Sequence, residues 1–165
     1  MTTQLPDAEE TLLALADRMR GAVAYEAAFV GIYSGGAWLA ERLPALVPGD
    51  HPVGFIDVSF YRDDYSTTGL KGGSRRTTLP FNVDGATIVL VDDVLFTGRS
   101  VRAAVNELFD FGRPARIELA VLIDRGGREL PIEPTYCGAR LTVAQDLSIV
   151  LSREHDRLKL DVQKS

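Results

Sequence analysis

The sequence has few of the features that mark secreted, membrane-spanning or strongly basic proteins. It contains one cysteine, Cys137, so an intrachain disulfide is excluded and nothing indicates an oxidising compartment. No apolar run approaches the roughly 18 residues that a membrane-spanning helix needs. The net charge of −5 excludes an overall basic surface of the kind that binds nucleic acid, and leaves room only for a local basic patch.

Signatures of targeting and of several enzyme classes are also missing. The first residues include Asp7, Glu9 and Glu10 and lack the basic-then-apolar order of a signal peptide, so we expect a cytoplasmic protein with no membrane partner. The sequence shows no Walker A loop, no Rossmann glycine motif, no zinc-type spacing and no Ser-His-Asp pattern. It therefore gives no support for a P-loop enzyme, a dinucleotide-binding enzyme, a zinc protein or a serine hydrolase.

Length and periodicity predict one α/β domain that spans residues 1–165. The composition is 45% apolar and 25% charged, as in ordinary globular domains. Apolar runs of strand length alternate with helical patterns, which predicts a mostly parallel sheet flanked by helices. The expected helices cover 7–25, 37–46 and 101–111, the expected strands cover 28–33, 53–61, 86–91 and 117–123, and 147–151 with 158–162 form a C-terminal hairpin.

The most informative segment runs from 89 to 100, where an apolar strand ends in two adjacent carboxylates, Asp92 and Asp93. A short turn, Thr97–Ser100, follows, and a helical pattern begins at Val101. The N–H groups at a helix N-terminus lack partners and the helix dipole is positive there, so anions bind well. This order of strand, acidic pair, turn and helix therefore predicts a phosphate site.

The acidic pair predicts the rest of the ligand. Asp92 and Asp93 point to opposite faces of the strand, so at least one carboxylate reaches hydroxyl groups or a hydrated cation beside the phosphate. Two adjacent acids at the end of a buried strand are costly unless they serve such a purpose. A ligand that carries a phosphate and vicinal hydroxyls, such as a ribose 5-phosphate, satisfies both features.

Two further strand ends carry candidate binding residues. Ser34, Gly35 and Gly36 follow the first strand, and paired glycines allow a ligand to approach the backbone closely. Asp124 and Arg125 follow the fourth strand, and the backbone after them could read the edge of a planar base. Ligands of open parallel sheets bind beyond the carboxyl ends of the strands, so we expect both segments to face the same crevice as the acidic pair.

A long polar segment, Arg62–Asn82, has no periodicity and is rich in Gly, Ser and Thr. Such a segment inside a compact domain is usually functional, and we expect a flexible lid. Arg62 suits the oxygens of a diphosphate, because a guanidinium binds them in a bidentate fashion. Lys71, Arg75 and Arg76 are candidates for screening the charge of a leaving group when the lid closes.

Several segments together resemble the PyrR family of type I phosphoribosyltransferases. They read Ile-Asp-Val-Ser-Phe-Tyr-Arg-Asp-Asp at 56–64, Val-Asp-Asp-Val-Leu-Phe-Thr-Gly-Arg-Ser-Val-Arg at 91–102, Gly-Arg-Pro at 112–114 and Leu-Ala-Val-Leu-Ile-Asp-Arg-Gly-Gly-Arg-Glu-Leu-Pro-Ile at 119–132. The segment at 91–102 resembles the family's motif for phosphoribosyl diphosphate (PRPP). The segments at 56–64 and 119–132 separate PyrR from adenine, hypoxanthine and orotate enzymes.

The resemblance implies a type I phosphoribosyltransferase fold with a small hood and a flexible lid, acting on uracil and PRPP to give UMP and diphosphate. It implies Mg2+ as cofactor, a homo-oligomer, and a role in sensing uridine nucleotides to regulate pyrimidine biosynthesis genes. The catalytic residues that it implies are Asp92, Asp93 and Arg62, with the two acids holding Mg2+ through water or PRPP. The implied substrate-binding residues are Ser34, Gly35, Gly36, Val94, Leu95, Phe96, Thr97, Gly98, Arg99, Ser100, Asp124 and Arg125.

Some positions depart from the family pattern. Ser34–Gly36 stand where many relatives have Thr-Arg-Gly, Gly127 stands where His is frequent, and the segment 138–144 differs from the usual tail. Two alternatives therefore stay open: an RNA-binding attenuator that senses uridine nucleotides with little catalysis, and a phosphoribosyltransferase for another base. We expect weak binding to RNA, because the first expected helix carries only Arg18 and Arg20 as cations.

Overall fold

The computed structural model describes residues 4–59 and 77–165. Its elements in chain order are α1 (Ala8–Met19), β1 (Ala28–Ile32), α2 (Gly35–Arg42), the 3-10 turn η1 (Leu43–Ala45), β2 (Val53–Ile56), β3 (Thr87–Leu95), α4 (Arg99–Phe111), β4 (Arg116–Asp124), β5 (Tyr136–Arg140), β6 (Leu147–Glu154) and β7 (Arg157–Lys164). Arg62, Lys71, Arg75 and Arg76 lie outside the described residues, as does most of the expected lid.

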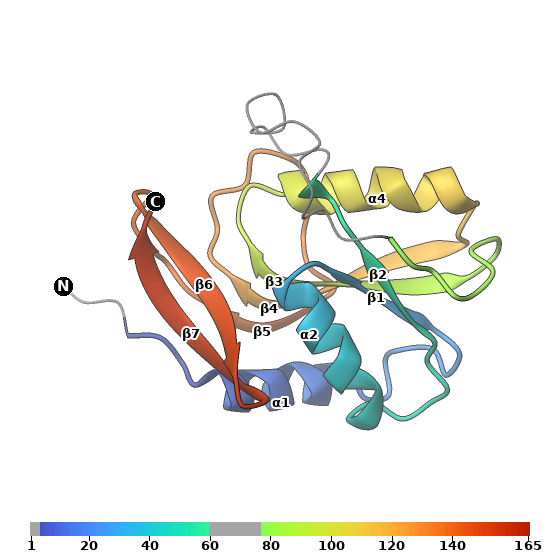
Figure 1. Ribbon diagram of the computed structural model, residues 1–165, viewed down its shortest axis with the longest axis horizontal. Coiled ribbons are helices and arrows are strands. Elements are labelled where there is room, and N and C mark those ends of the chain that lie inside the picture. Colours follow the sequence, from blue (N-terminus) through green and yellow to red (C-terminus); the bar gives the residue numbers. More distant parts are fainter. Residues whose placement is uncertain (1–3, 60–76) are drawn as a thin grey trace.

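A parallel sheet in the order β2-β1-β3-β4-β5 forms the centre of the molecule. Helix α4 covers one face of the sheet, and α1 and α2 cover the other (Figure 1). Because the inner strands are buried on both faces, they are continuous apolar runs, and every residue of β1 is buried. The expected fold, a mostly parallel sheet flanked by helices, is confirmed.

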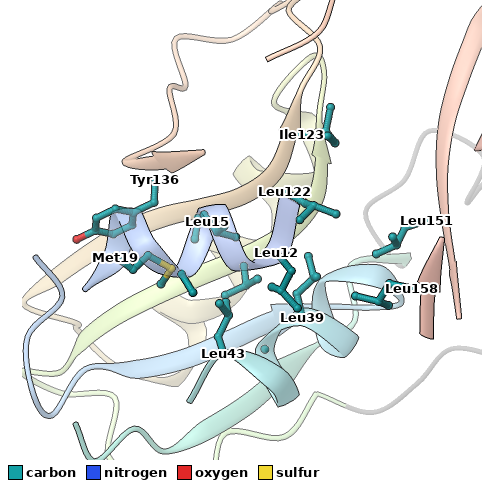
Figure 2. Close-up of a cluster of buried hydrophobic side chains, with 14 of the residues drawn as sticks. Leu12, Leu15, Met19, Leu39, Leu43, Leu122, Ile123, Tyr136, Leu151 and Leu158 are labelled. Atoms are coloured by element: carbon teal, nitrogen blue, oxygen red, sulfur yellow. The ribbon is translucent and has the colours of Figure 1, made fainter. Parts of the chain in front are cut away.

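Two apolar clusters hold these layers together. The first lies between the sheet and α1 with α2, and Leu151 and Leu158 from the C-terminal hairpin belong to it together with Leu12, Leu15 and Leu39 (Figure 2). The second lies between the sheet and α4, and it includes Val30, Ile88, Leu90, Ala104 and Leu108. Burial of these side chains is the main force that fixes the helices on the sheet.

Strands β6 and β7 form an antiparallel hairpin, the small hood that was expected at the C-terminus. The turn residues His155 and Asp156 both have positive φ, as tight hairpin turns require. The hairpin is fastened to the helices by Glu9 of α1, whose carboxylate accepts hydrogen bonds from Arg42 of α2 and from the Leu158 backbone. None of the helices in the described ranges is long and apolar enough to cross a membrane.

Several boundaries differ from those expected. Strand β2 ends at Ile56, so the strand expected over 53–61 is wrong for residues 57–59. Helix α1 ends at Met19 instead of reaching residue 25, because Gly21 takes a left-handed conformation directly after the cap at Arg20. Strand β3 runs on to Leu95, so that Asp92 and Asp93 lie within it, because β4 continues to pair alongside. Strand β5 was not expected at all, since a short run that follows Pro131 and Pro134 and contains Gly138 gives little periodic signal.

The last residues of the expected lid, 77–82, belong to the packed body. Thr78 exchanges two backbone hydrogen bonds of 2.8 Å with Phe55 of β2. Leu79 and Phe81 pack against the cluster under α4. The prediction of a lid that reaches Asn82 is therefore wrong for these residues, because their backbone and side chains are already bound to the sheet.

Candidate functional site

The candidate site lies where the parallel strands end. In the order β2-β1-β3-β4-β5, the chain changes direction across the sheet between β1 and β3. Open parallel sheets bind ligands at this switch point, outside the carboxyl ends of the strands. Ser34 follows β1 here, and the acidic pair with the turn Thr97–Ser100 belongs to β3 and α4. The segments that the sequence singled out on these two strands are thus brought together.

The turn between β3 and α4 has the geometry of an anion site. Gly98 caps α4 with φ of +95°, a conformation that glycine adopts without strain. The N-cap residue Gly98 has no side chain, and Arg99 and Ser100 are exposed, so the start of α4 faces solvent. The Thr97 hydroxyl accepts a hydrogen bond of 3.2 Å from the Arg99 backbone. A 13-residue helix thus begins at an open turn, as the phosphate prediction requires.

Asp92 and Asp93 lie on opposite faces of β3. Asp92 is 7% exposed and follows Leu90 on the α4 face, whereas Asp93 contacts Gly35 at the start of α2. Each carboxylate accepts a backbone hydrogen bond from the next residue, Asp93 N at 2.9 Å and Val94 N at 2.8 Å. These bonds fix the two side chains at the strand end, so both carboxylates are oriented before any ligand arrives.

Gly35 and Gly36 have a packing role that the sequence did not reveal. The sequence analysis placed them in a turn, but α2 begins at Gly35 and includes both. A Cβ at Gly35 would overlap the Asp93 carboxylate, and a Cβ at Gly36 would overlap the Val91 carbonyl oxygen. The missing side chains therefore let the N-terminus of α2 approach β3 closely. The Tyr33–Ser34 peptide bond directly before this helix is cis.

Asp124, at the end of β4, is the centre of an ion-pair cluster. It is 2% exposed and accepts two hydrogen bonds from Arg128, at 2.7 and 2.8 Å, and one from Arg140 at 2.6 Å. Burial raises the pKa of Asp124, but the hydrogen bonds from Arg128 and Gly126 and the charges of both arginines outweigh it and lower the pKa below its ordinary value. Asp124 is therefore ionised and fixed.

Arg125, the next residue, is buried and points its guanidinium at the hood. Nη1 donates to the Leu147 carbonyl oxygen at 2.6 Å and Nη2 to the Ala144 carbonyl oxygen at 3.1 Å. The guanidinium carbon also lies 3.9 Å from the centroid of the Phe96 ring, a cation–π contact. Within the described residues, Nε has no hydrogen-bond partner. The Arg125 side chain thus binds carbonyl oxygens at the hood and the Phe96 ring.

The loop after β4 is hydrogen-bonded to the turn before α4. The backbone N–H groups of Glu129 and Leu130 both donate to the Thr97 carbonyl oxygen, at 3.0 and 3.1 Å. Arg128 Nη1 donates to the Phe96 carbonyl oxygen at 3.2 Å. Arg99 forms an exposed ion pair of 2.9 Å with Glu129. Of these loop residues, Arg128 and Glu129 were not identified from the sequence as site residues, although Arg128 stands four positions after Asp124.

A cavity of about 410 Å³ opens beside the ends of β4 and β5. Asp124, Gly126, Gly127, Arg140 and Thr142 are among the residues that line it. The cavity is large enough for a planar base, and backbone groups of the loop after β4 border it. No group of three or more His, Cys, Asp or Glu side chains with metal-binding geometry occurs in the described part of the chain.

Comparison with known proteins decides the family. Residues 3–142 match the phosphoribosyl transferase domain. The bifunctional protein PyrR of Ralstonia nicotianae is 53% identical over 158 residues, covering 93% of this chain and 90% of that protein. The bifunctional protein PyrR of Pseudomonas aeruginosa is 46% identical over 151 residues, 89% of each chain. The chain belongs to the PyrR family. The resemblance drawn from the sequence motifs is thereby confirmed.

Solved structures agree with the PyrR assignment at the level of the fold. A hypoxanthine-guanine phosphoribosyltransferase from Bacillus anthracis superposes with a TM-score of 0.64 and 18% sequence identity, covering 86% of this chain and 85% of that chain. Because the identity is low, this likeness concerns the architecture and not the base. The type I phosphoribosyltransferase fold expected for a PyrR protein is therefore present.

Proposed function

We propose that the protein is a uracil phosphoribosyltransferase of the PyrR type, which converts uracil and PRPP to UMP and diphosphate. The observation that carries the proposal is the acidic pair on β3 directly ahead of the open turn Thr97–Ser100, at the switch point of the sheet. A ribosyl phosphate needs donors for its phosphate and acceptors for its hydroxyls, and this segment offers both. Membership of the PyrR family supports uracil as the base.

In this proposal each part of PRPP has its own group of residues. The 5-phosphate binds the backbone N–H groups and hydroxyls of Thr97–Ser100. Val94–Phe96, which directly precede this turn, belong to the same binding segment. The ribose hydroxyls face Asp92 and Asp93. The diphosphate lies toward Ser34, Gly35 and Gly36 at the N-terminus of α2, and Arg62 and Mg2+ are its cationic contacts.

The chemistry is positional and electrostatic. Transfer at C1 of the ribose passes through a centre with positive charge, which two fixed carboxylates favour. Asp92 is buried, and a charge in a water-poor site interacts more strongly than one in bulk water. The backbone hydrogen bonds that hold both carboxylates mean that they need little reorganisation during the reaction.

The residues present fit a magnesium ion that is shared with the substrate. Mg2+ in phosphate-transfer sites is held by one or two carboxylates together with substrate oxygens, and Asp92 and Asp93 supply oxygen ligands of this kind. When bound, the ion would neutralise charge on the diphosphate. Asp92 and Asp93 would hold it directly or through water.

The base would occupy the cavity beside Asp124. Asp124 and Arg125 shape its wall, and because their side chains are held by Arg128, Arg140 and the hood, the backbone after β4 is left to read the base edge. A rigid backbone is suited to this task, since N–H and C=O groups at fixed spacing select one pattern of base edge.

A second, regulatory role is supported by the relatives, which bear the name bifunctional protein PyrR. We assign to this chain a role as a uridine-nucleotide sensor in the regulation of pyrimidine biosynthesis genes, acting as a cytoplasmic homo-oligomer. The nucleotide would bind at the same site as the product UMP. We expect direct binding to RNA to be weak, because the chain is acidic overall.

Turnover with PRPP and a panel of bases tests the proposal. Uracil, adenine, hypoxanthine, guanine and orotate are each supplied with PRPP and Mg2+, and formation of nucleotide and diphosphate is measured. Uracil is expected to be the preferred substrate. Preference for a purine base would replace the proposal by a phosphoribosyltransferase of another specificity. Nucleotide binding without turnover on any base would favour a pure sensor.

A further inference from the structure

Arg125 is a buried cation that forms no ion pair with a carboxylate in the described ranges, 4–59 and 77–165. Among the described residues, its guanidinium is held only by two carbonyl oxygens and the Phe96 ring. A buried charge that lacks an ion pair is unfavourable unless the surrounding groups are arranged to accept it. Here the groups that accept it come from two separate parts of the molecule, the approach to the hood at 144–147 and the exit of β3 at Phe96.

Phe96 is also in close contact with the loop after β4. Gly127 has φ of +78°, and a Cβ at this position would overlap the Phe96 ring, so the ring occupies the space that a side chain would need. The Phe96 carbonyl oxygen accepts a hydrogen bond from Arg128, as described above. Ring and backbone of Phe96 are thus both held, one residue before the turn Thr97–Ser100 begins.

We propose that Arg125 is a positioning residue that couples the C-terminal hood to the phosphate turn through Phe96. The guanidinium is planar and forked, so one side chain satisfies two carbonyl oxygens on the hood side and stacks on an aromatic ring. Holding the ring holds the entry of the turn Thr97–Ser100, and so the spacing of its N–H groups. The inference rests on the proposed function, because it assigns the 5-phosphate of PRPP to this turn.

The test is a set of variants assayed for both turnover and local opening. Arg125→Met and Arg125→Lys each remove the stack and the fork, and Lys retains the charge. Both are expected to raise the KM for PRPP about tenfold with kcat changed less than about twofold, because the phosphate is held equally before and during transfer. Amide hydrogen exchange in the segment 97–102 is expected to accelerate about tenfold in both variants.

Phe96→Leu breaks the same Arg125–Phe96 contact by removing the ring. It keeps the test valid if an Arg125 variant fails to fold. The double variant Arg125→Met with Phe96→Leu is expected to be no worse than either single variant, because both changes break one connection. Arg153→Met is the matched control. It removes an arginine of β6 that lies over another aromatic ring, 5.1 Å from the centroid of Trp38, but it leaves the Phe96 stack intact. Its KM for PRPP is expected to stay within about twofold of the wild-type value.

Three outcomes would overturn the inference. Wild-type KM and exchange in Arg125→Lys would show that the charge alone suffices. A lower unfolding midpoint with unchanged KM and exchange would show a merely structural role. Additive effects in the double variant would show two independent contacts. If the wild-type protein turns over no base, the proposed function fails, and the exchange measurement still decides whether Arg125 holds the turn.

Discussion

Replacement of Glu9 by Gln tests the ion pair that fastens the hood to the body. The Glu9 carboxylate accepts hydrogen bonds from Arg42 at 2.8 and 2.9 Å and from the Leu158 backbone at 2.9 Å. The Arg42 hydrogen bond first, and then the Leu158 backbone and the charges of Arg42 and Arg157, lower the pKa of Glu9 from 4.5 to about 2 against the opposing effect of burial. One carboxylate thus joins α1, α2 and β7.

The pKa shift sets the size of the expected effect. Each pKa unit corresponds to about 1.4 kcal/mol, so the shift represents about 3 kcal/mol of stabilisation at neutral pH. The Arg42 side chain is 37% exposed, and solvent screening reduces the expected loss to about 2 kcal/mol. Because the pKa of the folded state is depressed, the stabilisation is complete above pH 4.5 and is lost as pH falls through about 2.

Urea denaturation of wild type and Glu9→Gln at neutral pH and at lower pH is the assay. The variant is expected to be about 2 kcal/mol less stable at neutral pH, and the difference is expected to narrow as pH falls toward 2. Glu41→Gln is the matched control, since its pair with Arg153 is 3.4 Å long and both side chains are more than a third exposed. Equal stability of the two variants, or a difference that does not change with pH, would refute the reasoning.

Three further changes probe other parts of the account. Gly36→Ala is expected to lower stability by about 1–3 kcal/mol in urea denaturation, because its Cβ overlaps the Val91 carbonyl oxygen; an unchanged midpoint would contradict the close contact of α2 with β3. Chelation with EDTA is expected to abolish UMP formation and leave the unfolding midpoint unchanged, since Mg2+ is assigned to the substrate complex; a falling midpoint would indicate a structural metal. Affinity for a pyrimidine-leader RNA at physiological salt is expected to be slight, because the net charge is −5 and Arg20 already pairs with Asp17; submicromolar, UMP-stimulated binding in a filter assay would contradict this.

Much of the fold could be predicted because buried parallel strands leave a clear pattern. The apolar runs of β1, β3 and β4 alternate along the chain with helical patterns, and this alternation predicts a parallel sheet with helices on both faces. The turn at Thr97–Ser100 was also visible, since Gly98 marks the point at which strand period changes to helix period. The hairpin β6–β7 was found from two alternating segments joined by a polar turn.

The remaining features depend on contacts between distant residues. The end of β3 at Leu95 is set by pairing with Asp124, which no local pattern records. Gly35 and Gly36 look like a turn in sequence, but their lack of a Cβ matters because β3 lies against them. The sequence likewise did not show that Arg125 reaches the hood near Leu147, because arginine at a strand end is compatible with many partners.

The central claim is that Asp92 and Asp93 act on the ribose of PRPP. The direct measurement is the rate of UMP formation by the double variant Asp92→Asn with Asp93→Asn, with Asp110→Asn as a control on the exposed face of α4. The account predicts a loss of about 10³-fold or more in turnover by the double variant, with an unfolding midpoint close to that of wild type, and near-normal turnover by the control. Near-normal turnover in a folded double variant would contradict the account.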